Sequence, residues 1–373
     1  DSVKKDFIKR KGIDIKDSVS IRFSYDFHPS SRVVMLPQII ILGSQAPWID
    51  PRIPIRKDLH LGSFIKIPGY KESLQNVDKI EGLLKMGLTE EWITAQMQQA
   101  KQNNQTDVGL LISNGLDEIK FYLLSDDGSV YCFESIFEGV EFQRTPDGHN
   151  VLSDKKVGIV GLGSLGSKIA VTLARSGVKN FYLVDYDLFM PDNIKRHVLN
   201  WKDVGEHKVD AVKNVLSNID KNITVESKTI NLTGQESASY LDVCLRKMAS
   251  CDLIIDATAN DRVFNLLASV AKNEQKKFLW TVVFEGGKGG QVARYVPSKD
   301  PMPQLIRAAC NEFYLKHPLP ETQIVGKYAV ENEDGRVFIA SDADVSVIAD
   351  NAAKFAIDCL AEIYEYEYPV YLI

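Results

Sequence analysis

The sequence lacks an apolar run long enough to cross a bilayer, although 45% of its 373 residues are hydrophobic. A membrane-spanning helix needs about 20 consecutive apolar residues, and the apolar run at 33–42 is shorter and contains Pro37. The polar start at Asp1 also lacks an initiator Met and a signal-peptide core. We therefore predict no membrane partner, and we expect the natural protein to extend further upstream.

Positive charge is not in excess, since the sequence has 44 Lys and Arg residues but 50 Asp and Glu residues, which gives a net charge of −6. Proteins that bind the DNA or RNA backbone usually carry a basic surplus, so the sequence argues against a nucleic-acid partner. The five cysteines form no Cys-x-x-Cys pair and no regular framework, which argues against a structural zinc site. Scattered thiols are typical of a cytoplasmic protein.

The length predicts two domains, because single domains commonly have about 100–200 residues. We place a smaller mixed α/β domain without a nucleotide motif at residues 1–150 and a second domain at 151–373. In the first domain, helical spacing predicts helices at 71–86 and 89–102. Runs of β-branched and aromatic residues predict strands at 33–42, 108–113, 119–124 and 129–133.

In the second domain, apolar strands alternate with amphipathic helices. This alternation predicts a doubly wound α/β fold, with a mostly parallel sheet covered on both faces. The predicted strands lie at 156–160, 180–184, 225–230, 253–256 and 278–283. The predicted helices lie at 164–176, 208–219 and 262–272.

A glycine-rich turn follows the first of these strands and opens the next helix at Ser164. Gly161 permits a tight turn, Gly163 lets phosphate approach the backbone, and Gly166 lets helix and strand pack closely. The backbone N–H groups and the positive helix N-terminus favour an anion there. Asp185 ends the next strand, at the spacing of a carboxylate that hydrogen-bonds ribose. These features predict a nucleotide site, for either a nicotinamide dinucleotide or ATP.

The segment after Asp185 carries Asp187 and an Asn193-x-x-Arg196 pair, and Lys208 ends a Gly-x-x-Lys motif. These motifs resemble those of the ThiF/MoeB superfamily of ubiquitin-activating-type enzymes. A triphosphate carries about four negative charges, and Arg196 and Lys208 supply cationic partners that a dinucleotide does not need. The motifs therefore favour ATP.

The resemblance covers roughly residues 152–360 and implies a Rossmann-like adenylation domain that uses ATP and Mg²⁺. It implies that Asp185 binds ribose and that Asp187 lies near the α-phosphate and the metal. It assigns the phosphates to Asn193, Arg196 and Lys208. The implied reaction is attack of a protein C-terminal carboxylate on the α-phosphate, which gives an acyl-adenylate and pyrophosphate.

One departure from the family pattern concerns the metal. Ala259 stands where the metal-associated aspartate of the family usually lies. Asp256 and Asp261 are the remaining candidates for Mg²⁺, which commonly uses one or two carboxylates plus phosphate oxygens. The alternative is that these two acids only cap the following helix.

A second departure concerns the thiol on which many relatives capture the acyl group. Cys310 is a candidate, although it lies in a helical pattern where a cysteine is usually a buried apolar residue. The segment around Ala340 and Ser341 resembles ThiF-type domains that are fused to a ubiquitin-conjugating-like domain in bacterial CBASS antiphage systems. A thiol is expected on this loop in such proteins; here it is either replaced or the loop is an ordinary one.

The resemblance also implies partners. Such fusion proteins act on cGAS-like nucleotidyltransferases, and a conjugating-like domain would lie upstream or in trans. Family members form homodimers in which an arginine of the partner completes each site, and Arg144 is the candidate here. We expect the acceptor's C-terminal tail to pass over the glycine-rich segment 286–291, where backbone groups would stay free for pairing.

Two other functions remain open from the sequence. A nicotinamide oxidoreductase would use the same glycine turn, but it leaves Arg196 and Lys208 unexplained. A catalytically silent adenylation-like scaffold would explain Ala259 and the missing thiol.

Overall fold

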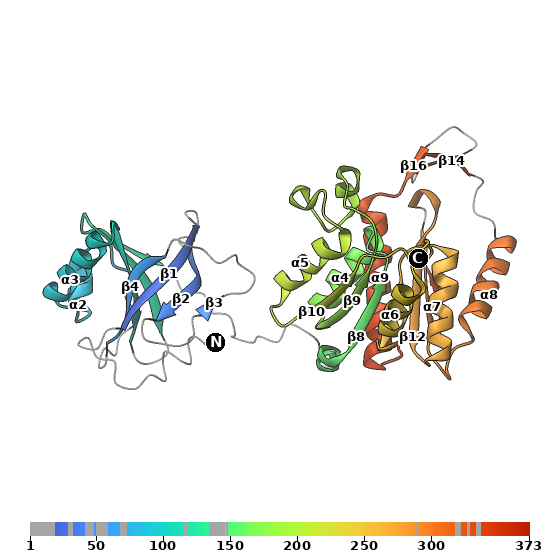
Figure 1. Ribbon diagram of the computed structural model, residues 1–373, viewed down its shortest axis with the longest axis horizontal. Helices are drawn as coiled ribbons and strands as arrows, with labels where there is room; N and C mark the ends of the chain where they lie inside the picture. Colours follow the sequence, from blue (N-terminus) through green and yellow to red (C-terminus); the bar gives the residue numbers. More distant parts are fainter. Residues whose placement is uncertain are drawn as a thin grey trace. The chain divides into compact units, whose positions relative to one another are not determined.

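The structure, a computed structural model, divides the chain into two compact units, Asp1–Phe142 and Gln143–Ile373 (Figure 1). The predicted boundary after residue 150 falls in η2 (His149–Asp154), in the second unit. Among the described residues, no helix has the length and apolarity to span a membrane. The described residues are 19–28, 33–41, 48–49, 59–67, 73–114, 118–133, 146, 148–287, 289–317, 322–326, 329–332 and 337–373.

The first unit contains a seven-stranded sheet in the order β3-β2-β1-β4-β5-β6-β7. Its neighbours pair antiparallel except β4 and β5, which pair parallel. The strands are β1 (Val19–His28), β2 (Val33–Ile41), β3 (Trp48–Ile49), β4 (His60–Lys66), β5 (Asp107–Ser113), β6 (Ile119–Ser125) and β7 (Val130–Phe133). The four strands predicted in this part of the sequence are confirmed.

Two helices, α2 (Ile80–Lys85) and α3 (Glu90–Gln102), connect the parallel strands β4 and β5. A parallel pair needs such a crossover, because a short turn cannot reverse the chain twice. Leu83 and Ile93 of the helices are buried in one cluster with Leu110 of the sheet. The predicted helix 89–102 is confirmed.

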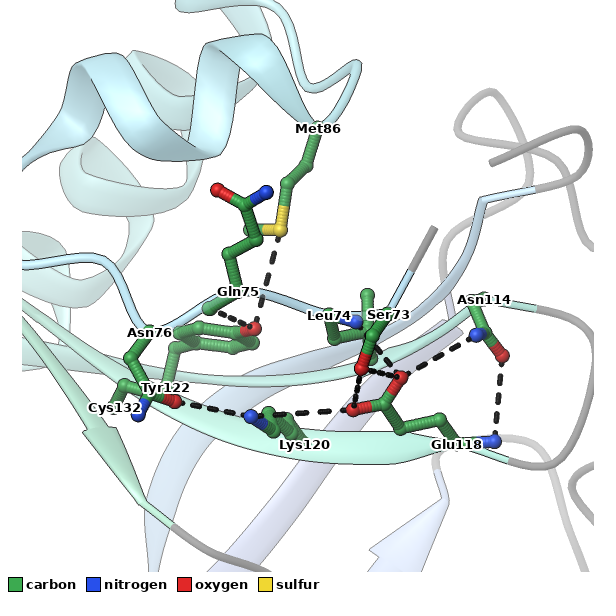
Figure 2. A network of polar contacts seen from close by, with 10 residues as sticks. All are labelled: Ser73, Leu74, Gln75, Asn76, Met86, Asn114, Glu118, Lys120, Tyr122 and Cys132. Carbon is green, nitrogen blue, oxygen red and sulfur yellow. Dashed lines mark hydrogen bonds and ion pairs between the residues drawn. The ribbon is translucent and has the colours of Figure 1, made fainter. Parts of the chain in front are cut away.

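The predicted helix at 71–86 is wrong in its first part, since residues 73–77 have no regular secondary structure. The Leu74 N–H donates to the Glu118 carboxylate at 2.7 Å, and the Tyr122 hydroxyl donates to the Gln75 carbonyl at 2.9 Å (Figure 2). Ser73 also donates to Glu118, at 3.0 Å. Side chains near and on β6 thus occupy the backbone groups that a helix would pair internally, so the helix begins only at Ile80.

The second unit contains a seven-stranded sheet in the order β10-β9-β8-β11-β12-β13-β17. The first five strands are parallel, and β13 and β17 are antiparallel to their neighbours. The strands are β8 (Lys156–Val160), β9 (Asn180–Val184), β10 (Thr224–Lys228), β11 (Leu253–Asp256), β12 (Lys277–Val283), β13 (Gly290–Tyr295) and β17 (Val370–Leu372). The predicted doubly wound, mostly parallel fold is confirmed.

Both faces of this sheet are covered by helices, as its side-chain alternation requires (Figure 1). Ile159 of β8 and Ile255 of β11 pack against α4 (Ser164–Arg175), α5 (Lys208–Ile219) and α9 (Asp342–Ala361). Their neighbours Val160 and Ile254 join the opposite cluster. Its helices are α6 (Ala238–Ala249), α7 (Asp261–Asn273) and α8 (Pro303–Lys316).

The strand order reverses direction between β8 and β11. After β8 the chain adds β9 and then β10 on one side of it. The later strands, beginning with β11, are added on the other side. In open α/β sheets, ligands bind outside the carboxyl ends of the strands at such a reversal. A smaller antiparallel sheet of β14 (Thr322–Gly326), β15 (Ala329–Asn332) and β16 (Val337–Ile339) precedes α9.

Candidate active site

A cavity of about 520 Å³ lies at the carboxyl ends of β8, β9 and β11, at the reversal point. This volume is in the range of small-molecule and cofactor sites. Most of the residues predicted to form the nucleotide site line it. They are Gly161, Gly163, Ser164, Asp185, Asp187, Asn193, Arg196 and Lys208. The structure thus brings together residues from four separate connecting segments and helix ends.

The three glycines of the turn differ in their surroundings. Gly161 has φ +85°, a conformation that side chains disfavour. A Cβ on Gly166 would lie 1.9 Å from the Gly161 carbonyl oxygen, whereas a Cβ on Gly163 would meet no heavy atom within 4 Å. Gly166 therefore permits the close packing of α4 on β8, and Gly163 leaves the backbone accessible from the cavity.

Asp185 holds this turn in place. One carboxylate oxygen accepts a hydrogen bond from the Leu162 N–H at 2.6 Å, and the other accepts one from the Asp187 N–H at 2.8 Å. Burial raises the pKa of Asp185, although these two hydrogen bonds oppose the rise. Each oxygen has a second lone pair, so the carboxylate can also accept from a ligand hydroxyl.

Lys208 and Asp187 form an ion pair at the cavity, with 2.7 Å between Nζ and the carboxylate. Lys208 is the first residue of α5, and its side chain is 9% exposed, against 47% for Asp187. An ammonium has three donors, of which this contact uses one. The pair therefore places a cation and a helix N-terminus at the same edge of the cavity.

Arg196 and Asn193 lie on the adjacent segment η3 (Pro191–Arg196). The Arg196 guanidinium donates to the Ala340 carbonyl at 3.2 Å, which ties η3 to the segment before α9. The Asn193 side-chain oxygen accepts from the Met190 N–H at 3.0 Å and closes the first turn of η3. Both residues line the cavity.

His197 lines the same cavity, and the sequence analysis gave it no role. Its Nε2 lies 2.7 Å from the Leu162 carbonyl oxygen, and the residue is 8% exposed. Burial lowers its pKa to about 4. The only hint in the sequence was the position of His197 directly after Arg196. The carbonyl that His197 contacts belongs to a residue 35 positions earlier in the chain.

The two carboxylates proposed for a metal do not line the cavity, although the four residues between them, 257–260, do. Asp256 is buried at the end of β11, where it accepts from the Thr258 N–H and hydroxyl at 2.9 and 2.6 Å. Asp261 pairs with Arg307 at the start of α7. In the part of the chain that the structure describes, no three His, Cys, Asp or Glu side chains group closely enough to hold a metal. These residues do not form an all-protein metal cage.

The positions considered for a thiol also differ. Cys310 is 9% exposed in the core formed by α6, α7 and α8, and burial raises its pKa. Ala340 lines the cavity, while Ser341 caps α9 through a reciprocal contact with Asp344. Of the three positions, only Ala340 is part of the cavity wall. Arg144, the predicted trans arginine, lies outside the described residues.

The expectation of a free backbone at 286–291 is wrong at Gly290. Its N–H and carbonyl pair with the Ile373 carbonyl and N–H, each at 2.9 Å, so β17 covers this edge of β13. Gly286 and Gly287 lie in a turn with φ of 69° and 75°, before β13 begins. A Cβ on Gly287 would lie 2.7 Å from the Ala340 Cα, so this glycine permits a close backbone approach.

The chain resembles several adenylyltransferases and activating enzymes. It is 33% identical over 138 residues to molybdopterin-synthase adenylyltransferase of Escherichia coli, which covers 37% of this chain and 51% of that protein. It is also 33% identical over 130 residues to the ATP-dependent ubiquitin transferase-like protein Cap2 of Enterobacter hormaechei, covering 35% and 21%. The chain thus spans about half or less of the length of these relatives.

Solved structures to which the chain is similar include E. coli MccB with ATP and selenomethionine PaaA. MccB with ATP has 17% identity and a TM-score of 0.42, covering 58% of this chain and 59% of that chain. PaaA has 20% identity and a TM-score of 0.47, covering 61% of this chain and 71% of that chain.

The family model of the ThiF family matches residues 141–323, which include the glycine turn and every motif residue that lines the cavity. Residues 141–323 are therefore a ThiF family domain.

Proposed function

We propose that this chain is an ATP-dependent adenylating enzyme that activates the C-terminal carboxylate of a protein or peptide. The observation that carries the proposal is the convergence of the glycine turn, Arg196 and Lys208 on one cavity. Two helix N-termini, those of α4 and α5, lie at that cavity and favour anions. The relationship to molybdopterin-synthase adenylyltransferase supports the same chemistry.

In the proposed reaction, a carboxylate oxygen forms a bond to the α-phosphorus of ATP. The bond from that phosphorus to the bridging oxygen breaks, and pyrophosphate leaves with the bonding electrons. The carboxylate is already ionised at pH 7, so no general base is needed. The site's contribution is positioning and neutralisation of charge by Lys208, Arg196 and the backbone N–H groups.

Mg²⁺ enters this proposal bound to the ATP phosphates, as part of the substrate. Asp187 is the half-exposed carboxylate that lines the cavity, and its side chain lies beside Lys208. A magnesium ion held by phosphates commonly needs only one or two protein carboxylates. Asp187 therefore fits a magnesium–nucleotide complex, although the described residues form no separate cage.

The finer proposals concern the acceptor and the steps that follow. From the motif resemblance we propose a role in bacterial antiphage defence, with a cGAS-like nucleotidyltransferase tail as acceptor and thioester transfer through a ubiquitin-conjugating-like domain. The similarity to an ATP-dependent ubiquitin transferase-like protein, Cap2, supports activation of the ubiquitin type. We also propose a homodimer in which Arg144 of one protomer reaches the site of the other. A flexible tail is required as acceptor, because a folded domain cannot bring its terminal carboxylate within the ~3–3.5 Å needed for attack.

ATP–pyrophosphate exchange tests the proposal. The chain is incubated with ATP, Mg²⁺, labelled pyrophosphate and a panel of C-terminal peptides, each paired with the same peptide carrying a C-terminal amide. Exchange with the free carboxylate and none with the amide is the expected result. ATP binding without exchange for any acid peptide or tailed protein would instead identify a catalytically silent scaffold. Light scattering of the same sample measures the mass, and a monomer with intact exchange would refute the trans role of Arg144.

A further inference from the structure

The peptide backbone between Gly161 and Gly163 is held by side chains on both sides. The Leu162 N–H donates to Asp185 at 2.6 Å, and the Leu162 carbonyl lies 2.7 Å from Nε2 of His197. Leu162 itself is fully buried. Both backbone groups of this residue are therefore bound by side chains, which fixes the orientation of the peptide units on either side.

The contacts of His197 define which nitrogen carries the proton. The Leu199 N–H donates to Nδ1 at 3.2 Å, so the ring's proton is on Nε2 and is donated to the Leu162 carbonyl. The ring packs against Phe189, with centroids 5.0 Å apart. The charged groups that act on it are Lys208, Lys168 and Asp203, but burial is the largest cause of its lowered pKa. The imidazole is therefore neutral near pH 7.

The bound carbonyl belongs to the same peptide unit as the Gly163 N–H. This unit is trans, so its carbonyl and its N–H point in opposite directions. Because the carbonyl is held against the buried His197, the Gly163 N–H faces away from His197. A Cβ on Gly163 would meet no heavy atom within 4 Å, so this side of the residue is open. Among the described residues, no hydrogen bond from the Gly163 N–H is found.

We propose that His197 is a positioning residue that fixes the Leu162–Gly163 peptide, so that the Gly163 N–H is aimed at a phosphate group in the cavity. The inference rests on the proposed function for the identity of the anion. A hydrogen bond to an ionised phosphate is among the stronger ones, and a donor oriented in advance needs no reorganisation when the ligand binds. His197 thereby acts through the backbone rather than by touching the nucleotide.

Two substitutions distinguish the contact made by Nε2 from the contact made by Nδ1. In His197→Gln, the side-chain amide nitrogen stands where Nε2 stood and can donate to Leu162. In His197→Asn, the amide oxygen stands where Nδ1 stood and can accept from Leu199, but the side chain does not reach Leu162. Calorimetry measures the Kd of each variant for ATP, tripolyphosphate and adenosine. We expect the His197→Asn variant to bind ATP and tripolyphosphate on the order of tenfold more weakly than wild type and to bind adenosine with unchanged affinity. The affinities of the His197→Gln variant should stay within about threefold of wild type.

A purely structural His197 gives a different pattern, in which both variants lose thermal stability and bind adenosine and ATP equally poorly. That pattern, or Asn binding ATP like the wild type, overturns the inference. A measurement on the unaltered chain covers the case of unfolded variants: the Gly163 amide signal in a ¹H–¹⁵N spectrum must shift when tripolyphosphate saturates the chain. A Gly163 signal that stays in place, or a wild type that binds neither ATP nor tripolyphosphate, also overturns the inference. Phosphate binding without pyrophosphate exchange contradicts the proposed function alone.

Discussion

Glu118 in the first unit and Asp185 in the second perform the same local task in different surroundings. Glu118 accepts from the Leu74 N–H at 2.7 Å and fastens a coil segment to the sheet (Figure 2). Asp185 accepts from the Leu162 N–H at 2.6 Å and fastens the glycine turn. Each contact satisfies a buried or half-buried backbone donor that would be costly to leave unpaired.

The difference lies in what surrounds each carboxylate. Beside Asp185 is a cavity of about 520 Å³, onto which Lys208, Arg196 and two helix N-termini converge. The partners of Glu118 are the backbone and side chains of its own unit, with Lys120 at 3.9 Å. A polar network alone therefore does not indicate a site. Convergence of anion-binding groups on an open cavity does.

Gly166→Ala should break the second unit most severely. Its methyl group would lie 1.9 Å from a backbone oxygen, so we expect a loss of about 3 kcal/mol or more in the free energy of unfolding. Gly163→Ala is the matched control, because its methyl group meets no atom within 4 Å. Denaturant unfolding should show the control within about 0.5 kcal/mol of wild type, and its ATP affinity should nevertheless fall. Equal stability of the two variants would contradict the assigned roles of the glycines.

Asp256→Asn should stabilise the second unit in a pH-dependent way. Burial raises the folded-state pKa of Asp256 to about 6 from an ordinary 3.8, so its ionisation weakens the fold as pH rises from 3.8 to about 6, and the full loss is present above that. The variant should gain up to about 3 kcal/mol over wild type at pH 7.5 and nothing at pH 3.5. Unfolding curves at both pH values measure this, with Asp261→Asn at the exposed neighbour as control. A gain that is the same at both pH values would rule out the titration of Asp256 as its cause.

Lys208→Ala should weaken ATP binding by about 2 kcal/mol, the typical cost of losing a charge-assisted hydrogen bond. The exposed Lys202→Ala removes the same charge a few residues away and should leave the affinity within about 0.5 kcal/mol. Calorimetric titration of both variants at one salt concentration measures the difference. If the two substitutions weaken ATP equally, general charge rather than the position of Lys208 governs binding.

Glu118→Gln should have the smallest effect, confined to the first unit. The amide oxygen can still accept from Leu74, so the expected loss is about 1 kcal/mol. Hydrogen exchange should accelerate in residues 73–77, and ATP affinity should not change. A change in ATP affinity would show that the comparison between the two carboxylates is too simple.

Much of the second unit was predictable because its strands are short, buried and separated by amphipathic helices. The strands 180–184 and 253–256 and the helix 208–219 agree with the structure residue for residue. The glycine turn could be found because it lies directly after a strand, and the cationic residues because their motifs resemble those of a known family. Their convergence on one cavity followed from the fold.

The parts that could not be predicted depend on contacts between distant segments. The helix expected at 71–86 starts late because backbone groups of residues 74 and 75 are bound to Glu118 and Tyr122. The role of His197 depends on a carbonyl 35 residues earlier. The covering of Gly290 depends on the pairing of β13 with β17. None of these contacts leaves a periodic pattern in the sequence.

Titration of the unaltered chain with ATP·Mg²⁺ and with NAD tests the central claim most directly. The convergence of cations and helix N-termini on the cavity predicts one ATP site per chain and no measurable NAD binding. Excess NAD should then leave the ATP isotherm unchanged. Tight NAD binding without ATP binding would contradict the assignment of this cavity to a triphosphate.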